Sequence, residues 1–300
     1  MLSYREDTAV FTHPSLAFLG LGTMGHLMAE RLLAASQPLA VWNRTAARAD
    51  ALVAAGARRG GTPAAAVEHA MVIFIMVSDP AAVEQVLFEP AGAIAGARAG
   101  AIVIDCSTID PAHSREFAER CAATGHRYVE CPVMGSVDQA RTGTLVALAA
   151  GDADTISEVG PLLMLMARQV VRVGGPGSAS TLKLVMNLLV GGITELLAES
   201  ISVAEKAGLP LDVLRESLMT SVLASPFLGY KAPQLLERRY DPLFSARLML
   251  KDLTLVQQLA AQVGASLPAL DVIRAQYARA VDAGHGDQDF AVVREVVGHP

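Results

Sequence analysis

The stretch SLAFLGLGTMGHLMAERLL, Ser15 to Leu33, decides how the first half of this chain folds. It places Gly20, Gly22 and Gly25 in a G-x-G-x-x-G pattern directly after a short apolar run, and a helix-period segment follows at once. In this pattern the first glycine permits a tight turn, the second lets backbone amides approach a pyrophosphate, and the third lets the helix pack closely on the strand. The positive end of the helix faces the same phosphates. The stretch therefore predicts a strand, turn and helix that bind a dinucleotide, with a glycine-rich structural turn as the alternative.

The end of the second apolar run, residues 39–42, indicates which dinucleotide binds. NAD-binding sheets carry a carboxylate near this point that accepts hydrogen bonds from the ribose 2′-OH and would repel a 2′-phosphate. Here the chain continues with Asn43, Arg44 and Thr45. Arg44 and Arg48 are four residues apart, so a helix that starts near Thr45 as its N-cap would let both guanidinium groups face one phosphate. The sequence favours NADP over NAD; a solvated start of a surface helix is the alternative.

Composition and charge describe a compact globular protein. The 300 residues are 52% hydrophobic and 18% charged, and the net charge of -6 argues against nonspecific binding to nucleic acid. The longest apolar run, 70–77, is too short to cross a bilayer, and residues 1–14 read as a loose extension without a secretory signal. Cys106, Cys121 and Cys131 have no paired spacing, which fits free thiols. We therefore expect a cytoplasmic protein without a metal site and without nucleic-acid or membrane partners.

Strand-like and helix-like segments alternate from residue 15 to about 175, the pattern of a doubly wound α/β domain with a parallel sheet. Two of the runs, 71–77 and 101–106, are almost continuously apolar, as are strands that are buried on both faces. Further strands are expected over 128–131, 144–149 and 170–173. The glycine-rich break at 174–177 marks a boundary between a Rossmann-type NADP-binding domain over 15–176 and a second domain over 177–300.

The second half of the chain is expected to be all-helical. Residues 178–207 contain no proline and are apolar on most faces, which predicts one long interdomain helix of ~45 Å that something must bury. Shorter helices are predicted over 212–223, 247–264, 268–283 and 288–297. We expect a substrate and dimerisation domain whose long helix shares its apolar faces in a homodimer or homotetramer.

Within the long helix, Lys183 and Asn187 lie one turn apart and share a face. A lysine in so apolar a run is costly to bury unpaired, although it can also extend its ammonium group to the surface. Lys251 and Asp252 form a second polar pair. The turn at 131–136 leaves a strand through a glycine and can present free amides to a carboxylate, or serve only as a connection. Spacing alone leaves a catalytic role of Lys183 open.

Several separate motifs in order make the chain resemble the β-hydroxyacid dehydrogenase family from about residue 15 to 297. They are FLGLGTMG at 18–25, DCST at 105–108, PVMGS at 132–136, TGTL at 142–145, GSASTLKLVMN at 177–187, LKDL at 250–253 and GDQDF at 286–290. The pieces VWNRT and MVSDP are most similar to the branch of glyoxylate and succinic semialdehyde reductases, which uses NADPH. In one departure, Met134 stands where the family often has serine, so a hydroxyl contact to the substrate is in doubt.

The resemblance implies NADPH-dependent reduction of a small aldehyde acid, in which Lys183 protonates the developing alkoxide and Asn187 orients the ammonium group. The residues implied at the cofactor are Gly20, Leu21, Gly22, Thr23, Met24, Gly25, Asn43, Arg44, Thr45, Arg48, Val77, Ser78, Thr108 and Lys251. Those implied at the substrate are Ser107, Met134, Gly135 and Ser136, together with Lys183 and Asn187.

Three alternatives stay open. An NAD-dependent 3-hydroxyisobutyrate-type dehydrogenase is disfavoured by the missing acid after the second strand. An imine reductase shares the layout but usually lacks the lysine. A non-catalytic, chromatin-associated scaffold with a dehydrogenase-like fold is disfavoured by the acidic net charge and by the intact Lys183.

Overall fold

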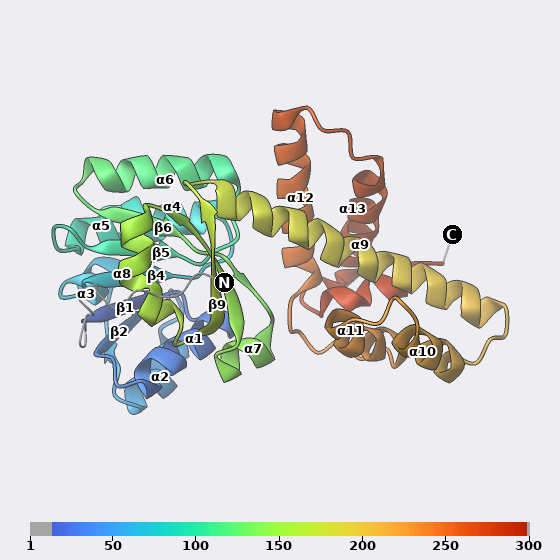
Figure 1. Ribbon diagram of the computed structural model, residues 1–300. Coiled ribbons are helices and arrows are strands. Elements are labelled where there is room, and N and C mark those ends of the chain that lie inside the picture. The colour runs from blue at the N-terminus through green and yellow to red at the C-terminus, as the bar shows by residue number, and fades with distance from the viewer. Residues whose placement is uncertain (1–13, 299–300) are drawn as a thin grey trace. The chain divides into compact units, whose positions relative to one another are not determined.

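The structure, a computed structural model, describes residues 14–298, so nearly all of the extension expected over 1–14 lies outside the described residues. The chain divides into two compact units, one ending at Lys183 and the other beginning at Leu184. The division falls inside the helix α9 (Ser178–Lys206), which the expected boundary at residue 176 precedes. The first unit contains the sheet and the second is helical (Figure 1).

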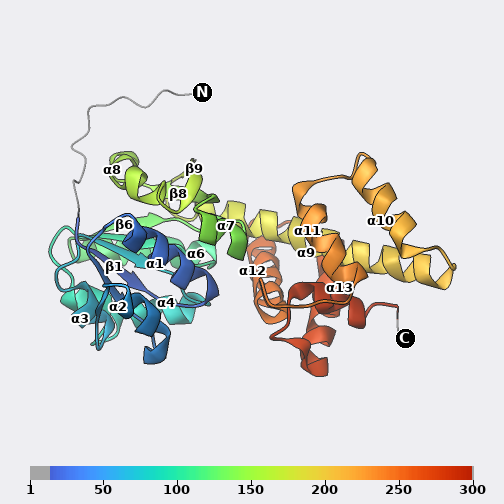
Figure 2. The ribbon, with the colours of Figure 1, turned by 90° about the horizontal axis from the view of Figure 1, so that it is seen from below.

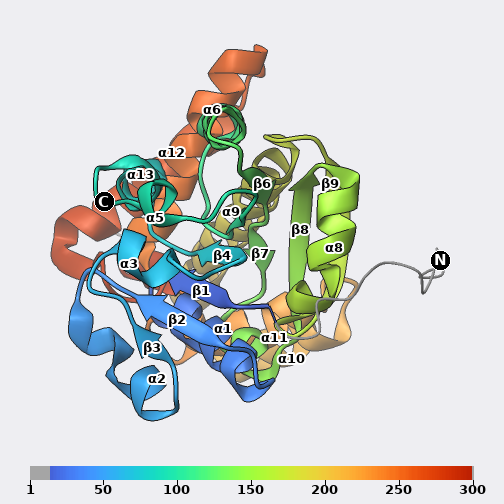
Figure 3. The same ribbon diagram turned by 90° about the vertical axis from the view of Figure 1, so that its left-hand side faces the viewer.

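The first unit is built on a nine-stranded sheet in the order β3-β2-β1-β4-β5-β6-β8-β7, with β9 beside β8 (Figure 3). The strands are β1 (Leu16–Leu19), β2 (Leu39–Trp42), β3 (Arg58–Arg59), β4 (Val72–Ile75), β5 (Ile102–Asp105), β6 (Arg127–Glu130), β7 (Val133–Met134), β8 (Leu145–Gly151) and β9 (Ala167–Gly174). The chain runs outward from β1 through β2 to β3 and then returns to the other side of β1 with β4. This reversal is a topological switch point, and in open α/β sheets ligands bind at the carboxyl ends of the strands at such a point.

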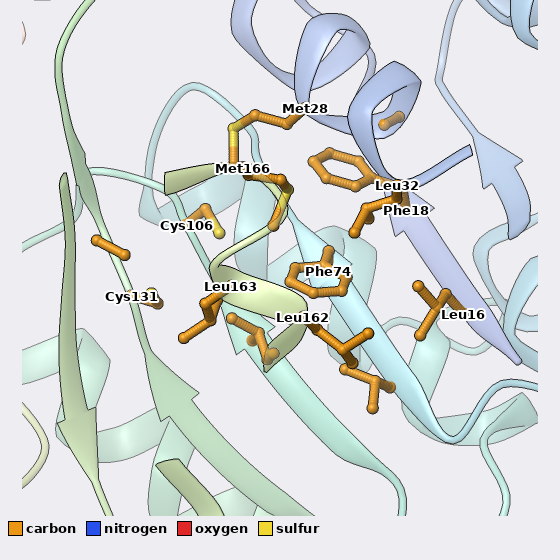
Figure 4. Close-up of a cluster of buried hydrophobic side chains, with 14 of the residues drawn as sticks. Leu16, Phe18, Met28, Leu32, Phe74, Cys106, Cys131, Leu162, Leu163 and Met166 are labelled. Carbon is orange, nitrogen blue, oxygen red and sulfur yellow. The ribbon is translucent and has the colours of Figure 1, made fainter. Parts of the chain in front are cut away.

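Alternating side chains supply two apolar layers, one on each face of the sheet. Phe18 and Phe74 stack on one face, with ring centroids 5.8 Å apart, and pack there against Met28 and Leu162 (Figure 4). The neighbouring positions on β1 and β4, which point to the other face, pack against Phe117 and its surroundings. All four residues of β4 and of β5 are buried, which confirms the prediction of strands covered on both faces.

Helices and short helical turns connect the strands of this unit. They are α1 (Thr23–Ala34), the 3₁₀ turn η1 (Ala46–Ala49), α2 (Asp50–Ala54), α3 (Pro63–Val67), α4 (Pro80–Phe88), α5 (Ala93–Gly96), α6 (Pro111–Ala123), α7 (Val137–Thr142) and α8 (Ala153–Leu163). The expected α/β architecture is confirmed, with one addition to its parallel sheet: β8 is antiparallel to both β6 and β7. The segment between β6 and β8 forms the two-residue β7, which pairs antiparallel with β8, and the short α7.

The second unit contains the rest of α9 and four further α-helices among its described residues. These are α10 (Leu211–Thr220), α11 (Pro226–Leu236), α12 (Ala246–Val263) and α13 (Pro268–Ala280). The sequence interpretation missed α11, which begins at a proline and contains a second one at Pro233. The helix expected over 288–297 is instead the 3₁₀ helix η3 (Phe290–Glu295), because the Asp289 side chain accepts from the amide of Ala291 and starts a tight turn. The end of the segment expected over 268–283 is a π-helical turn, η2 (Val281–His285).

Helix α9 is one uninterrupted helix (Figure 2), as predicted. Among residues 14–298 it is the one helix that is long and apolar enough to cross a membrane, and half of its most apolar window is buried inside the structure. Large apolar side chains nevertheless remain exposed along it at intervals of three, four and seven residues. They are Val185, Leu189, Ile193, Leu196 and Val203, here called the α9 apolar stripe.

Candidate functional site

The glycine motif forms the turn between β1 and α1. Gly20 has a φ of +99°, and a Cβ there would lie 2.2 Å from the carbonyl oxygen of Met76. A Cβ on Gly25 would lie 2.1 Å from the carbonyl oxygen of Gly20. Close packing therefore requires both glycines. A Cβ on the exposed Gly22 would meet no atom within 4 Å, so the space beside it is open. Because α1 starts at Thr23 without a side-chain cap, its first N–H groups are available to a ligand, and the turn fits a pyrophosphate.

Asn43 ties this turn to the end of β2. Its Oδ1 accepts a hydrogen bond of 2.8 Å from the Leu21 amide, and its Nδ2 donates to the Thr45 carbonyl oxygen at 3.0 Å. Both ends of the carboxamide are thus used inside the protein. Asn43 orders the rim of the glycine turn, where a carboxylate would stand in an NAD-binding sheet.

The segment after β2 keeps two arginines exposed at this edge. The helix expected near Thr45 begins at Ala46 as the 3₁₀ turn η1, so Arg44 lies outside the helix and Arg48 within it. Thr45 is the N-cap residue, but its hydroxyl makes no capping bond. The carboxylate of Asp50, which follows η1, is paired with Arg59. The edge therefore presents positive charge.

A buried network joins the ends of β4 and β5. Ser107 Oγ accepts from the Val77 amide at 3.0 Å, and the Ser107 amide donates to Asp105 Oδ1 at 2.9 Å. The Tyr128 hydroxyl donates to Asp105 Oδ2 at 3.0 Å. The sequence predicts Ser107 as a substrate-binding residue. In the structure its side chain is 2% exposed and bonds to the Val77 amide, which holds the loop after β4 in place. Burial, the dominant cause, raises the pKa of the Asp105 carboxyl from 3.8 to about 6.

Because of this raised pKa, the contribution of Asp105 to the stability of the protein depends on pH. The unfolded chain releases the Asp105 proton with its ordinary pKa of 3.8, while the folded protein keeps it up to about 6. The contribution of Asp105 to stability therefore falls as the pH rises through this window, by roughly 3 kcal/mol in all. We expect the free energy of unfolding of Asp105→Asn, minus that of the unmodified protein, to rise by that amount between about pH 4 and pH 7 in urea titrations.

Asp152→Asn is the control for this titration. Hydrogen bonds from Thr155 lower the pKa of the exposed Asp152 below its ordinary value of 3.8, so its contribution to stability changes only as the pH falls below about 4, and the corresponding difference should stay nearly constant between about pH 4 and pH 7. A pH-independent difference for Asp105→Asn would contradict an ionising carboxyl in this network.

Five further predicted residues of the first unit lie at or shortly after the ends of strands. Ser78 is exposed and donates from Oγ to Asp79 at 2.6 Å, while Val77 and Thr108 are half-buried. Met134 ends β7, and Gly135 follows it as an exposed residue.

The turn after β7 presents fewer free amides than expected. The Ser136 amide donates to Gln139 Oε1 at 2.8 Å, as one half of a capping box that starts α7. The S-x-x-Q spacing of Ser136 and Gln139 could have revealed this from the sequence. Its consequence is that Ser136 offers a ligand no free backbone amide.

In the second unit, Asp252 lies between two of the predicted site residues. Asn187 Nδ2 donates to Asp252 Oδ2 at 2.5 Å, and Lys251 Nζ lies 2.8 Å from Asp252 Oδ1. Asn187 and Asp252 are both buried. Because a carboxylate only accepts, the Asn187 amide nitrogen must face it, which leaves Asn187 Oδ1 as an acceptor for a cation. The sequence interpretation missed Asp252 as a site residue, although the LKDL motif contains it.

Lys183, the last residue of the first unit, is half-buried on the second turn of α9.

The three cysteines are free and buried. Among residues 14–298 no group of three or more His, Cys, Asp or Glu side chains is placed to hold a metal ion.

Comparisons with known proteins cover both units. Residues 15–175 match the family described as the NAD binding domain of 6-phosphogluconate dehydrogenase, and residues 177–297 match the NAD-binding domain of NADP-dependent 3-hydroxyisobutyrate dehydrogenase. Glyoxylate/succinic semialdehyde reductase 1 of Arabidopsis thaliana is 32% identical over 94% of this chain and 98% of its own length.

Two further similar proteins are a nuclear factor and a protein whose solved structure contains NADP+. The cytokine-like nuclear factor N-PAC of Homo sapiens is also 32% identical, over 96% of this chain, but the chain spans only about half (52%) of that protein. The solved structure of Psf3 in complex with NADP+ and 2-OPP has a TM-score of 0.87 and 28% identity, and covers 94% of this chain and 99% of its own.

Proposed function

Since the chain belongs to the β-hydroxyacid dehydrogenase family, whose members are NAD(P)-binding oxidoreductases of hydroxyacids, we propose that it uses NADPH to reduce a small aldehyde acid of the glyoxylate or succinic semialdehyde type. The observation that carries the cofactor preference is the edge after β2. There, Arg44 and Arg48 are exposed, and Asn43 occupies the place of the acid that would repel a 2′-phosphate.

Each group of site residues has a role in this reaction. The amides of the Gly20–Gly25 turn bind the pyrophosphate, and Arg44 and Arg48 bind the 2′-phosphate. When bound, NADPH supplies the hydride. Lys183 gives a proton to the carbonyl oxygen as it gains charge, and Asn187, held by Asp252, accepts a hydrogen bond from the ammonium group.

A substrate screen tests this function. Oxidation of NADPH and of NADH is followed by absorbance with glyoxylate, succinic semialdehyde, methylmalonate semialdehyde and a cyclic imine. We expect NADPH oxidation with one of the first two aldehyde acids. Preference for NADH, or for the cyclic imine, would replace the proposal with the corresponding alternative. No oxidation at all would favour a non-catalytic scaffold.

We also propose that a second copy of the chain covers the α9 apolar stripe. A row of exposed apolar side chains at helical spacing is typical of an interface. Sedimentation at micromolar concentration should show a dimer or a larger assembly, and the double variant Leu189→Glu/Leu196→Glu should shift it toward monomer. Val263→Glu is the control, because Val263 is 68% exposed and lies on α12. A stable monomer before mutation would contradict the proposal.

A further inference from the structure

The first turn of α9 is held by a carboxylate from a distant strand. Glu130, the last residue of β6, is 1% exposed. Its Oε2 accepts hydrogen bonds from the amides of Gly177 at 2.8 Å and Ala179 at 3.3 Å, and its Oε1 accepts one from the amide of Ser180 at 2.6 Å. All three partners are backbone amides at the start of a helix that runs to Lys206.

These bonds do what a local N-cap residue does elsewhere. The first four N–H groups of a helix have no partner within it, and a buried carboxylate forms strong, charge-assisted bonds with them at the positive end of the helix. Because this cap comes from β6, it fixes the helix to the sheet and not only to its own chain neighbours.

The start of α9 also has little room to move. Gly177 has a φ of +89°, and a Cβ there would lie 2.5 Å from Arg115 Nη1 and 3.1 Å from the Pro111 carbonyl oxygen, both on α6. The helix therefore begins between the end of β6 and the start of α6.

Lys183 follows Ser180 by less than one turn and belongs to the same compact unit. A helix is stiff over this length, so the carboxylate that fixes Ser180 also limits where Lys183 can lie. The 131–136 turn, where the substrate is expected to bind, begins at the residue after Glu130. One side chain thus connects the helix that carries the proton donor to the strand that leads to this turn.

We propose that Glu130 is a positioning residue for Lys183: its carboxylate anchors the first turn of α9 so that the lysine is held in place for proton transfer. The proposal rests on the function proposed above. Displacement of a catalytic group by about 1 Å can cost 10²-fold in rate. The three amides need both oxygens of a carboxylate, because a glutamine offers one acceptor oxygen and turns an NH₂ group toward a donor.

The first test is the turnover of Glu130→Gln. We expect kcat for aldehyde reduction to fall by roughly 10- to 10²-fold while the dissociation constant of NADPH stays within about twofold, because the glycine turn is a separate element. Glu130→Asp keeps the charge and should give an intermediate value. Asp152→Asn is the matched control, since Asp152 caps α8 through the Thr155 amide at 2.8 Å and should leave kcat unchanged. Equal effects of Glu130→Gln and Asp152→Asn on kcat would overturn the proposal.

A double-mutant cycle separates positioning from general damage to the fold. If Glu130 acts through Lys183, Glu130→Gln should change kcat by less than about twofold once Lys183 is alanine. An undiminished loss in the Lys183→Ala protein would overturn the positioning role. Near-normal turnover of Lys183→Ala alone would instead overturn the proposed function. Should Glu130→Gln fail to fold, the same cycle is run with Glu130→Asp.

Discussion

Lys183→Ala should lower the turnover of aldehyde reduction by about 10²–10⁴, the usual contribution of a positioned general acid. The reason is that the carbonyl oxygen gains negative charge as the hydride arrives, and only a nearby proton donor relieves it without recruiting water. The measurement is the single-turnover rate with saturating NADPH, which reports chemistry and not product release.

Two comparisons make this result specific. The affinity for NADPH should survive in Lys183→Ala, because the glycine turn and the arginines lie on other elements. Lys206→Ala is a matched control on the same helix, since Lys206 is exposed and its ammonium group donates to the Gly298 carbonyl oxygen, away from the predicted site residues. If Lys183→Ala keeps near-normal turnover, its ammonium group extends into solvent and takes no part in the reaction.

The double variant Arg44→Ala/Arg48→Ala should lose the preference for NADPH over NADH by roughly 10²-fold or more. Each charge-assisted hydrogen bond to the 2′-phosphate contributes about 1.5–3 kcal/mol, and NADH has no phosphate at that position. We therefore expect KM for NADPH to rise while KM for NADH and kcat with either cofactor change little.

The control removes the same charge elsewhere. Arg127→Ala/Arg172→Ala deletes two arginines from β6 and β9, where their partners are Glu158 and Ser157. Equal losses in the two double variants would mean that NADPH responds to net charge alone. An unmodified protein that prefers NADH would show that the arginines do not select the cofactor.

Some parts of this protein could be predicted because their cause is local. The spacing of Gly20, Gly22 and Gly25 specifies a turn that only glycine allows, and the structure has that turn. The uniformly apolar runs that became β4 and β5 are buried at every position. The unbroken apolar segment after Gly177 is one helix. In each case the residues that define the element are within a few positions of one another.

The errors of the sequence interpretation have identifiable causes. The helix expected near Thr45 is a 3₁₀ turn, and the last predicted helix is 3₁₀ because Asp289 tightens its start. The sequence interpretation missed α11 because prolines are unusual inside a helix and this segment contains two. The second unit nevertheless forms the helix. The antiparallel direction of β8 was missed because a hydrophobic run has the same pattern in either direction.

The sequence by itself determined the α/β and helical halves, the glycine turn and the absence of an acid after β2, because these depend on neighbours along the chain. Only the tertiary structure decided which polar groups meet. Asn43 bonds to Leu21, Glu130 to the first turn of α9 and Asp252 to Asn187, across separations of 22 to 65 residues. No period or motif encodes such pairs. Each forms because a buried donor or acceptor must find a partner, and packing of the strands and helices leaves one within reach.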